Sequence, residues 1–169
     1  MKILKPIQVE QLLKLLDKKP RQSVAHFSEG SHLLTKNLQL FCKANESTYY
    51  LFSIKDVFYE KSKTKYANAT HINIVKFDLQ STTYQLQDRT YDYLISTLDF
   101  GQKNKSVFLE KCYPIIRNEG TIILITPTSD TIELNHWKSI LNERLYRSVK
   151  IINTIFDDYD VIIAKCRKK

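Results

Sequence analysis

Short apolar runs rich in β-branched and aromatic residues alternate with amphipathic segments along this chain of 169 residues. The strand-like runs cover 23–27, 48–54, 71–77, 91–97 and 121–126. Helical spacing of apolar residues predicts helices over 6–19, 32–44, 104–117 and 129–146, and a weaker one over 55–66. Two last strands, 149–155 and 160–166, are joined by Asp157-Asp158-Tyr159 and predict a hairpin. Such alternation calls for a parallel sheet with helices on both faces. We therefore predict an α/β three-layer sandwich, with a mostly parallel seven-stranded sheet and an antiparallel last strand.

The length of the chain fits one domain that buries its own core. Residues 1–20 are expected to form an N-terminal amphipathic helix, and residues 21–169 the α/β domain. No apolar run approaches the ~20 residues of a membrane helix, and no signal-peptide pattern is found at the start. The three cysteines lie far apart and outside any CxxC pair, which argues against disulfides and a metal site. We expect a cytoplasmic protein without a bound metal and without a membrane partner.

Positive charge is concentrated at both ends of the chain. The formal net charge is +8; residues 1–70 carry 12 Lys and Arg against 6 Asp and Glu, and residues 161–169 carry four cations and no acid. Basic segments bind nucleic acid by releasing counterions, but many lysine-rich surfaces are only solvated. Tyrosines and lysines also intermingle over residues 49–66, which suits either base stacking or half-buried strand positions. Each of these alternatives stays open at the level of sequence.

Two local stretches add a family resemblance to this order of elements. Tyr91 to Ser96 is an aromatic residue followed by Asp and an apolar run. Phe108 to Gly120 combines the end of the predicted helix with Asn118-Glu119-Gly120, which we interpret as a helix stop. Together with the closing hairpin, they make the whole chain resemble a class I S-adenosylmethionine-dependent methyltransferase with a Rossmann-like domain. One of the family's usual paired glycines is Glu119 here. The resemblance implies S-adenosylmethionine as cofactor and methyl transfer to an acceptor.

The first cofactor motif departs from the family pattern. On the family's spacing, His26 takes the acidic position at the end of the first strand, and Ser28 and His32 replace two of three glycines. Gly30 is the glycine that remains, although any strand-to-helix turn can require one. The resemblance makes His26, Ser28 and Gly30 candidate cofactor-binding residues in a degenerate motif.

The family's acid at the end of the second strand is replaced by Ser53, which the resemblance places beside the cofactor's ribose. Losing two hydrogen bonds to a charged acceptor, at roughly 1.5–3 kcal/mol each, weakens binding by two or more orders of magnitude. Asp56 is expected on the following turn, and Glu29 at the loop tip is a partial substitute. Asp78 stands where the family uses an acid beside the adenine, but an Asp after a strand also serves as a turn or cap residue.

Few other residues suggest chemistry. Asp99 follows the fourth strand, where open α/β sheets bind ligands, so it is the candidate catalytic residue; an exposed turn acid is the alternative. The four histidines have no metal spacing, and Cys42 and Cys112 fall on apolar helix faces.

Two functions follow from these observations. The first is methyl transfer from S-adenosylmethionine, a small-molecule methyl donor, to an unidentified acceptor by positioning the two in line. The second is a methyltransferase-fold protein that has lost the cofactor. It would bind nucleic acid or a partner protein through its basic N- and C-terminal segments.

Overall fold

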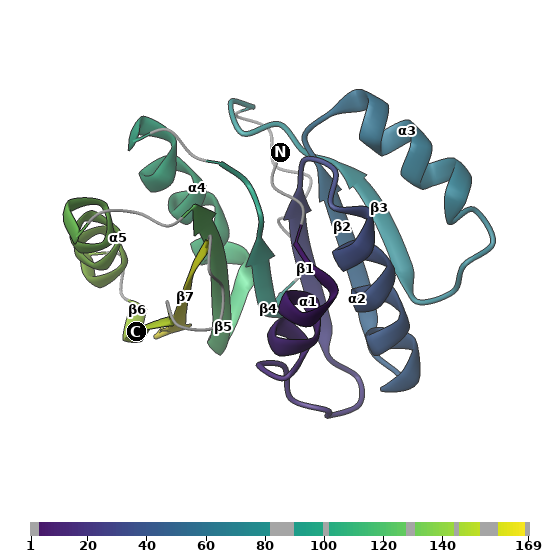
Figure 1. The fold of residues 1–169 in the computed structure, drawn as a ribbon, viewed down its shortest axis with the longest axis horizontal. Coiled ribbons are helices and arrows are strands. Elements are labelled where there is room, and N and C mark those ends of the chain that lie inside the picture. The colour runs from purple at the N-terminus through teal and green to yellow at the C-terminus, as the bar shows by residue number, and fades with distance from the viewer. Residues whose placement is uncertain are drawn as a thin grey trace. The chain divides into compact units, whose positions relative to one another are not determined.

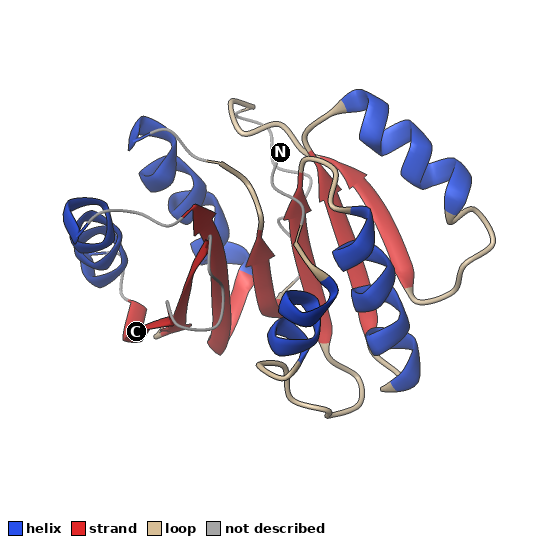
Figure 2. Cartoon of the chain, viewed as in Figure 1, coloured by secondary structure: helices blue, strands red, loops and turns tan. Residues whose placement is uncertain are grey.

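The computed structural model describes residues 4–81, 90–99, 102–127, 131–143, 146–152 and 159–167. Helices and strands alternate along these ranges (Figure 2). The chain divides into two compact units, Met1–Asp78 and Leu79–Lys169. The expected boundary at residue 20 stays a prediction. Within the described ranges, no helix is both long enough and apolar enough to cross a membrane.

The first unit is a parallel sheet with three helices (Figure 1). Its elements are α1 (Pro6–Leu13), β1 (Ser23–Ser28), α2 (His32–Ala44), β2 (Thr48–Ser53), α3 (Asp56–Lys65) and β3 (Ile72–Lys76). The strands lie in the order β3-β2-β1, and both pairs are parallel. Helix α2 packs on β2, and α3 packs on β2 and β3.

Helix α1 is shorter than the predicted range of 6–19. Pro6 opens it, and the side chain of Gln8 accepts a hydrogen bond of 2.8 Å from the N–H of Lys5. After Leu13 the backbone tightens: the N–H of Leu16 donates to the carbonyl of Leu13 instead of one residue further back. Leu16 is buried although it follows the end of the helix. Its helical spacing from Leu12 and Leu13 therefore indicated a buried position in a tight turn, and not a longer helix.

Strand register separates two faces of the first unit. Ser28 pairs with Ser53, and His26 with Leu51, so these side chains share one face. The opposite face carries three phenylalanine rings that touch one another. Phe27 stacks on Phe52 at 4.7 Å between ring centroids, and Phe77 meets Phe27 edge-on at 4.9 Å. All three rings are buried, so they form an aromatic core on that face.

The second unit contains β4 (Tyr91–Ser96), α4 (Gln102–Ile115), β5 (Ile116–Pro127), α5 (Thr131–Glu143), β6 (Tyr146–Ile152) and β7 (Tyr159–Cys166). The strands lie in the order β4-β5-β7-β6. Strand β4 is parallel to β5, and β7 is antiparallel to both of its neighbours. The mostly parallel α/β fold and the antiparallel pairing of the last two strands are therefore confirmed. The expected turn residues Asp157 and Asp158 lie outside the described residues.

The helix stop expected at Asn118-Glu119-Gly120 is wrong. Helix α4 ends at Ile115, and these three residues lie within β5, where the register with β4 shifts. Glu119 has a φ of 64°, as in a bulge. A side chain on Gly120 would lie 2.7 Å from Cγ1 of Ile116, so the glycine is required by close packing and not by a helix end.

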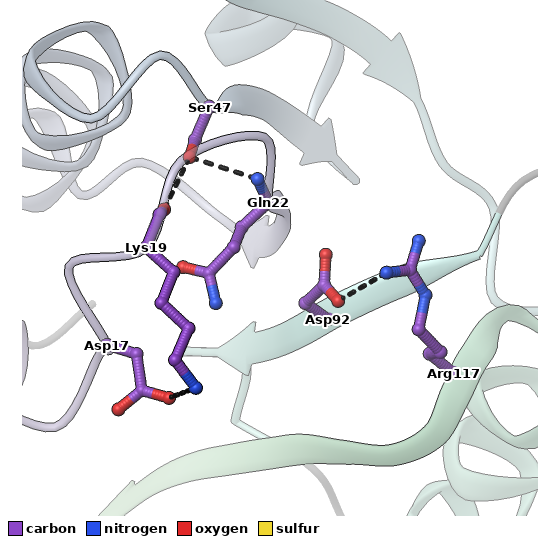
Figure 3. A network of polar contacts seen from close by, with 6 residues as sticks. All are labelled: Asp17, Lys19, Gln22, Ser47, Asp92 and Arg117. Carbon is purple, nitrogen blue, oxygen red and sulfur yellow. Dashed lines mark hydrogen bonds and ion pairs between the residues drawn. The ribbon is translucent and has the colours of Figure 1, made fainter.

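Local hydrogen bonds fix the connection from α1 to β1 against the start of β2 (Figure 3). The hydroxyl of Ser47 accepts a hydrogen bond from the N–H of Gln22 at 3.1 Å and lies 3.3 Å from the carbonyl of Lys19, to which it donates. Within the second unit, Arg117 of β5 donates to Asp92 of β4 at 2.8 Å. The first contacts hold the segment before β1 next to the segment before β2, and the last one holds β5 next to β4.

Candidate functional site

The candidate cofactor residues of the first unit lie where its parallel strands end. Ser28 and Ser53 are the last residues of β1 and β2, and they are neighbours across the pair; Ser53 in turn pairs with Lys76, the last residue of β3. The N–H of Phe77 donates to the carbonyl of Ser53 at 2.8 Å, so Asp78 follows directly beyond this edge. The structure thus brings Ser28 and Ser53 together at the ends of neighbouring strands.

His26 lies inside the unit, two residues before the end of β1. Its Nδ1 shares a hydrogen bond of 2.8 Å with the hydroxyl of Tyr49 on β2, and both side chains are fully buried. Burial lowers the pKa of His26 to about 3, so the ring is neutral near neutral pH. Burial likewise raises the pKa of Tyr49. Where the resemblance predicts an acid, the structure therefore has a neutral, hydrogen-bonded pair.

Tyr49 is a residue that the sequence reasoning did not connect with this position. In parallel strands the register decides which residues share a face, and Tyr49 pairs with Val24, two residues before His26. The alternation of β2 was a usable signal: it places Tyr49 on the same face as Leu51 and Ser53. The register itself could not be read from the sequence.

Ser28 bonds to the loop that follows it. Its hydroxyl accepts hydrogen bonds from the N–H of Gly30 at 3.2 Å and of Ser31 at 3.1 Å. Gly30 has a φ of 148°, a conformation essentially confined to glycine. The loop between β1 and α2 is thus a tight turn whose N–H groups already have an acceptor within the chain.

Ser53 is also bonded within the chain. It is fully buried, and its hydroxyl donates to the carbonyl of Lys55 at 3.0 Å. This bond holds the first turn of the connection from β2 to α3. The residue that the resemblance places beside the ribose is therefore a neutral hydroxyl that bonds to the backbone of its own connection.

Two ion pairs hold the acids near this edge. Glu29 of the first loop lies 3.2 Å from Lys55 of the second, which links the loops after β1 and β2. Asp56, the first residue of α3, lies 2.8 Å from Lys76 at the end of β3. The hydrogen bond and charge of Asp56 raise the pKa of Lys76. Glu29, the expected partial substitute for the ribose acceptor, and the nearby Asp56 are therefore both paired with lysines.

His32 begins α2 at the position of the third family glycine. Its ring is exposed and meets Phe58 of α3 edge-on, at 5.0 Å between centroids. The pKa of His32 is lowered by partial burial and then by the charges of Lys65 and Lys61. The bulky ring lies against α3, which shows how the helix accommodates it without a glycine.

The two candidate aspartates are exposed. Asp78 follows β3 in the first unit, and Asp99 follows β4 in the second. Of the basic ends, Lys5, Lys165 and Arg167 are exposed, and Lys168 and Lys169 lie outside the described residues. The roles assigned to His26, Ser28, Gly30, Ser53, Asp78 and Asp99 stay predictions.

Solved structures share this arrangement of elements. An O-methyltransferase from Thermotoga maritima that depends on S-adenosylmethionine matches with a TM-score of 0.77 and 15% identity, over 100% of this chain and 68% of that one. The fibrillarin pre-rRNA processing protein of Methanococcus jannaschii matches with a TM-score of 0.74 and 11% identity, over 98% of this chain and 76% of that one. The CurJ carbon methyltransferase matches with a TM-score of 0.70 and 14% identity, over 95% of this chain and 52% of that one.

The chain has the fold of the class I methyltransferases. At these identities the likeness shows the methyltransferase fold alone, and the chain spans about half the length of the CurJ protein, 52% of it. No protein-family model matches the sequence, and no curated protein does. Whether this methyltransferase fold uses a cofactor therefore depends on its own residues.

Proposed function

We propose that this chain is a methyltransferase-fold protein that works as an interaction module and does not use S-adenosylmethionine. The observation that carries the proposal is the bonding of the residues at the cofactor positions. His26 bonds to Tyr49, the hydroxyl of Ser28 to two N–H groups of its loop, and the hydroxyl of Ser53 to the carbonyl of Lys55. Each of these groups already has its partner inside the fold.

A cofactor bound in the family's way would have to replace these contacts. Each internal hydrogen bond contributes about 1 kcal/mol net, and a buried group left without a partner costs about 1–3 kcal/mol. The ribose would meet Ser53 instead of a carboxylate, and Glu29 and Asp56 are held by Lys55 and Lys76. The residues present therefore do not fit S-adenosylmethionine in the family's manner.

The proposed partner is a nucleic acid or a protein with negative charge, since the net charge of the chain is +8. We place the protein in the cytoplasm; the three free cysteines, all buried, support a reducing compartment. The basic N- and C-terminal segments remain candidate contact regions.

Methyl transfer from S-adenosylmethionine to an unidentified acceptor is the second candidate. It is supported by the methyltransferase fold, by Gly30 in a turn that requires glycine, and by Asp78 exposed directly after β3. In this reading Asp78 would accept a hydrogen bond from the adenine amino group, and Asp99 would orient the acceptor.

Isothermal titration with S-adenosylmethionine and with S-adenosylhomocysteine separates the two candidates. We expect no saturable heat and no rise in melting temperature at about millimolar ligand. Binding would be easy to detect under these conditions, because a ligand far above its Kd stabilises the native state by several kcal/mol. The Asp78→Asn variant is the matched control. Saturable binding by the wild type that is lost in this variant would reject the proposal and support the enzyme.

A further inference from the structure

His32 and two lysines of α3 form a cluster of basic side chains between α2 and α3. His32 is the first residue of α2, and its exposed ring meets Phe58 of α3 edge-on, at 5.0 Å between ring centroids. Lys61 and Lys65 follow Phe58 by three and seven residues, so all three side chains lie on the flank of α3 that faces His32. We name His32, Lys61 and Lys65 the α2–α3 basic cluster. It lies wholly in the first unit.

The two lysine charges of the cluster act on the histidine ring. Partial burial lowers the pKa of His32, and the charges of Lys65 and Lys61 lower it further. Lys61 and Lys65 are also four residues apart on one helix, where like charges repel. Positive charge is therefore concentrated at one point, and a bound anion would relieve the repulsion.

Acids of the neighbouring elements do not neutralise the cluster. Among the described residues, no carboxylate lies within ion-pair distance of its three side chains. Helix α2 contains no Asp or Glu. Asp56 at the start of α3 binds Lys76, and Glu29 of the loop before α2 binds Lys55. An anion would therefore bind without breaking an existing ion pair.

The nearest residues on α3 also leave the lysine charges in place. Glu60 precedes Lys61 and so projects about 100° away from it around the helix. The ammonium of Lys65 lies 5.6 Å from the centroid of the Tyr66 ring. This cation–π contact orders the ammonium and neutralises none of its charge.

The size and charge of the cluster favour one compact dianion. A phosphomonoester carries a charge of about −2 and three strong acceptor oxygens. Two ammonium groups and one imidazole supply donors to these oxygens, and the positive end of the α2 dipole adds to the attraction. A nucleic-acid backbone instead binds to cations spread over several phosphates.

We propose that the α2–α3 basic cluster binds the phosphate group of a phosphomonoester. The ammonium groups of Lys61 and Lys65 and a ring N–H of His32 donate to its oxygens. The inference rests on the proposed role as an interaction module and names the chemistry that this module recognises. A small phosphomonoester and a phosphorylated side chain of a partner protein present the same dianion, and the experiment separates these two sources.

NMR signals of the histidine rings report binding at the cluster. The chain has four histidines, and His32→Asn identifies the signal of His32. The ligands are glycerol 2-phosphate and a phosphoserine peptide with flanking alanines, and the peptide without phosphate is the ligand control. At about pH 7.5 both phosphomonoesters are dianions, because their second pKa is about 6.

We expect the His32 signal to shift saturably with both phosphomonoesters. The pKa of His32 should rise when the site is filled, because a bound dianion stabilises the imidazolium. Lys61→Gln/Lys65→Gln should weaken binding at least about tenfold, since hydrogen bonds between charged groups are lost. Glutamine keeps helix propensity in α3, and circular dichroism checks that the variant folds.

The matched control is Lys18→Gln/Lys63→Gln, which removes the same charge from two other exposed lysines. Lys63 lies about 200° around α3 from Lys61, so it is on the opposite flank. Neither control lysine is among the charges that lower the pKa of His32. This variant should bind within about twofold of the wild type.

The two phosphate sources give different affinities. At least about tenfold tighter binding of the phosphoserine peptide would assign the phosphate to a protein partner, and equal affinities would assign it to a small phosphomonoester. Three outcomes would overturn the inference: no saturable shift of His32 with either phosphomonoester, equal losses in the two double variants, or equal binding of the peptide without phosphate. Binding of an oligouridylate without terminal phosphate, and of neither phosphomonoester, would assign the cluster to a nucleic-acid backbone instead.

These results are independent of the titration with S-adenosylmethionine. A protein that binds both the cofactor and a phosphomonoester would refute the proposed loss of the cofactor and keep the phosphate site. A protein that binds neither would lose the phosphate site and keep the proposed role as an interaction module.

Discussion

The hydroxyl of Tyr49 lies 2.8 Å from Nδ1 of His26, and neither side chain is exposed to solvent. The two residues come from neighbouring parallel strands, and their rings are stacked at 6.2 Å with an angle of 24°. A neutral, bonded pair therefore occupies the position where the resemblance led us to expect an acid. This contact contributes one buried hydrogen bond to the stability of the first unit.

Replacing Tyr49 by phenylalanine should destabilise the protein. The Tyr49→Phe variant leaves a nitrogen of His26 buried without its partner, which costs about 1–3 kcal/mol. Urea unfolding followed by circular dichroism measures the change. Tyr59→Phe is the control, because Tyr59 is half-buried and phenylalanine keeps the ring that Lys63 contacts. The free energy of unfolding of this control should stay within about 0.5 kcal/mol of the wild type. Equal effects in both variants would contradict the role of the pair.

Acid should destabilise the protein through His26. Its pKa is lowered from 6.5 to about 3 in the folded state, so the unfolded chain binds the additional proton between these values. Stability is thus complete above about pH 6.5 and falls, as pH decreases toward 3, by up to roughly 1.4 kcal/mol per pH unit. Unfolding free energies at several pH values test this. His26→Gln should flatten the profile, whereas a variant of the exposed His71, His71→Asn, should keep it.

The thiols should be inert in the native protein. Cys42, Cys112 and Cys166 are all buried, and burial raises the pKa of Cys42 to about 12 and that of Cys112 well above its usual range. Thiolates react and thiols do not, so a disulfide reagent at about pH 8 should label these cysteines only after denaturant is added. The Lys63→Cys variant supplies an exposed thiol that labels at once. Rapid labelling of the wild type would show that a thiol is accessible.

A glycine at the end of α2 should stabilise the protein. Glu46 follows the helix with a φ of 50°, and the N–H of Ser47 donates to the carbonyl of Cys42 at 2.8 Å, as in a Schellman motif. Glycine is favoured at such a position, because a β-carbon is strained there. Glu46→Gly should raise the unfolding free energy by about 0.5–1 kcal/mol, and Glu46→Ala should not. A gain of equal size in both variants would place the effect in the lost charge instead.

The order of elements was predictable because it depends on local periodicity. Alternating apolar runs and helical spacing gave the parallel strands of both units and the antiparallel β7. The errors lie at element ends. Leu16 has helical spacing but follows the end of α1, and Gly120 is a close-packed residue of β5 instead of a helix stop. In both places a tight turn or a close contact overrides the local pattern.

The candidate site was only partly predictable. The resemblance placed Ser28 in the turn after the first strand and Ser53 at the end of the second; in the structure the two are the last residues of β1 and β2 and are neighbours in the register. The motif spacing could not show that the hydroxyl of Ser53 turns back to Lys55, or that Glu29 pairs with Lys55 of another loop. These contacts depend on side-chain directions that a spacing pattern does not contain.

The sequence alone determined which segments become strands and helices, because apolar periodicity is a local property of the chain. Only the tertiary structure decided what the polar residues at the strand ends bind. His26 and Tyr49 are 23 residues apart, and their hydrogen bond exists because β1 and β2 pair in one register out of several. That register is fixed by burial of the aromatic face on the other side of the strands, where Phe27 stacks on Phe52.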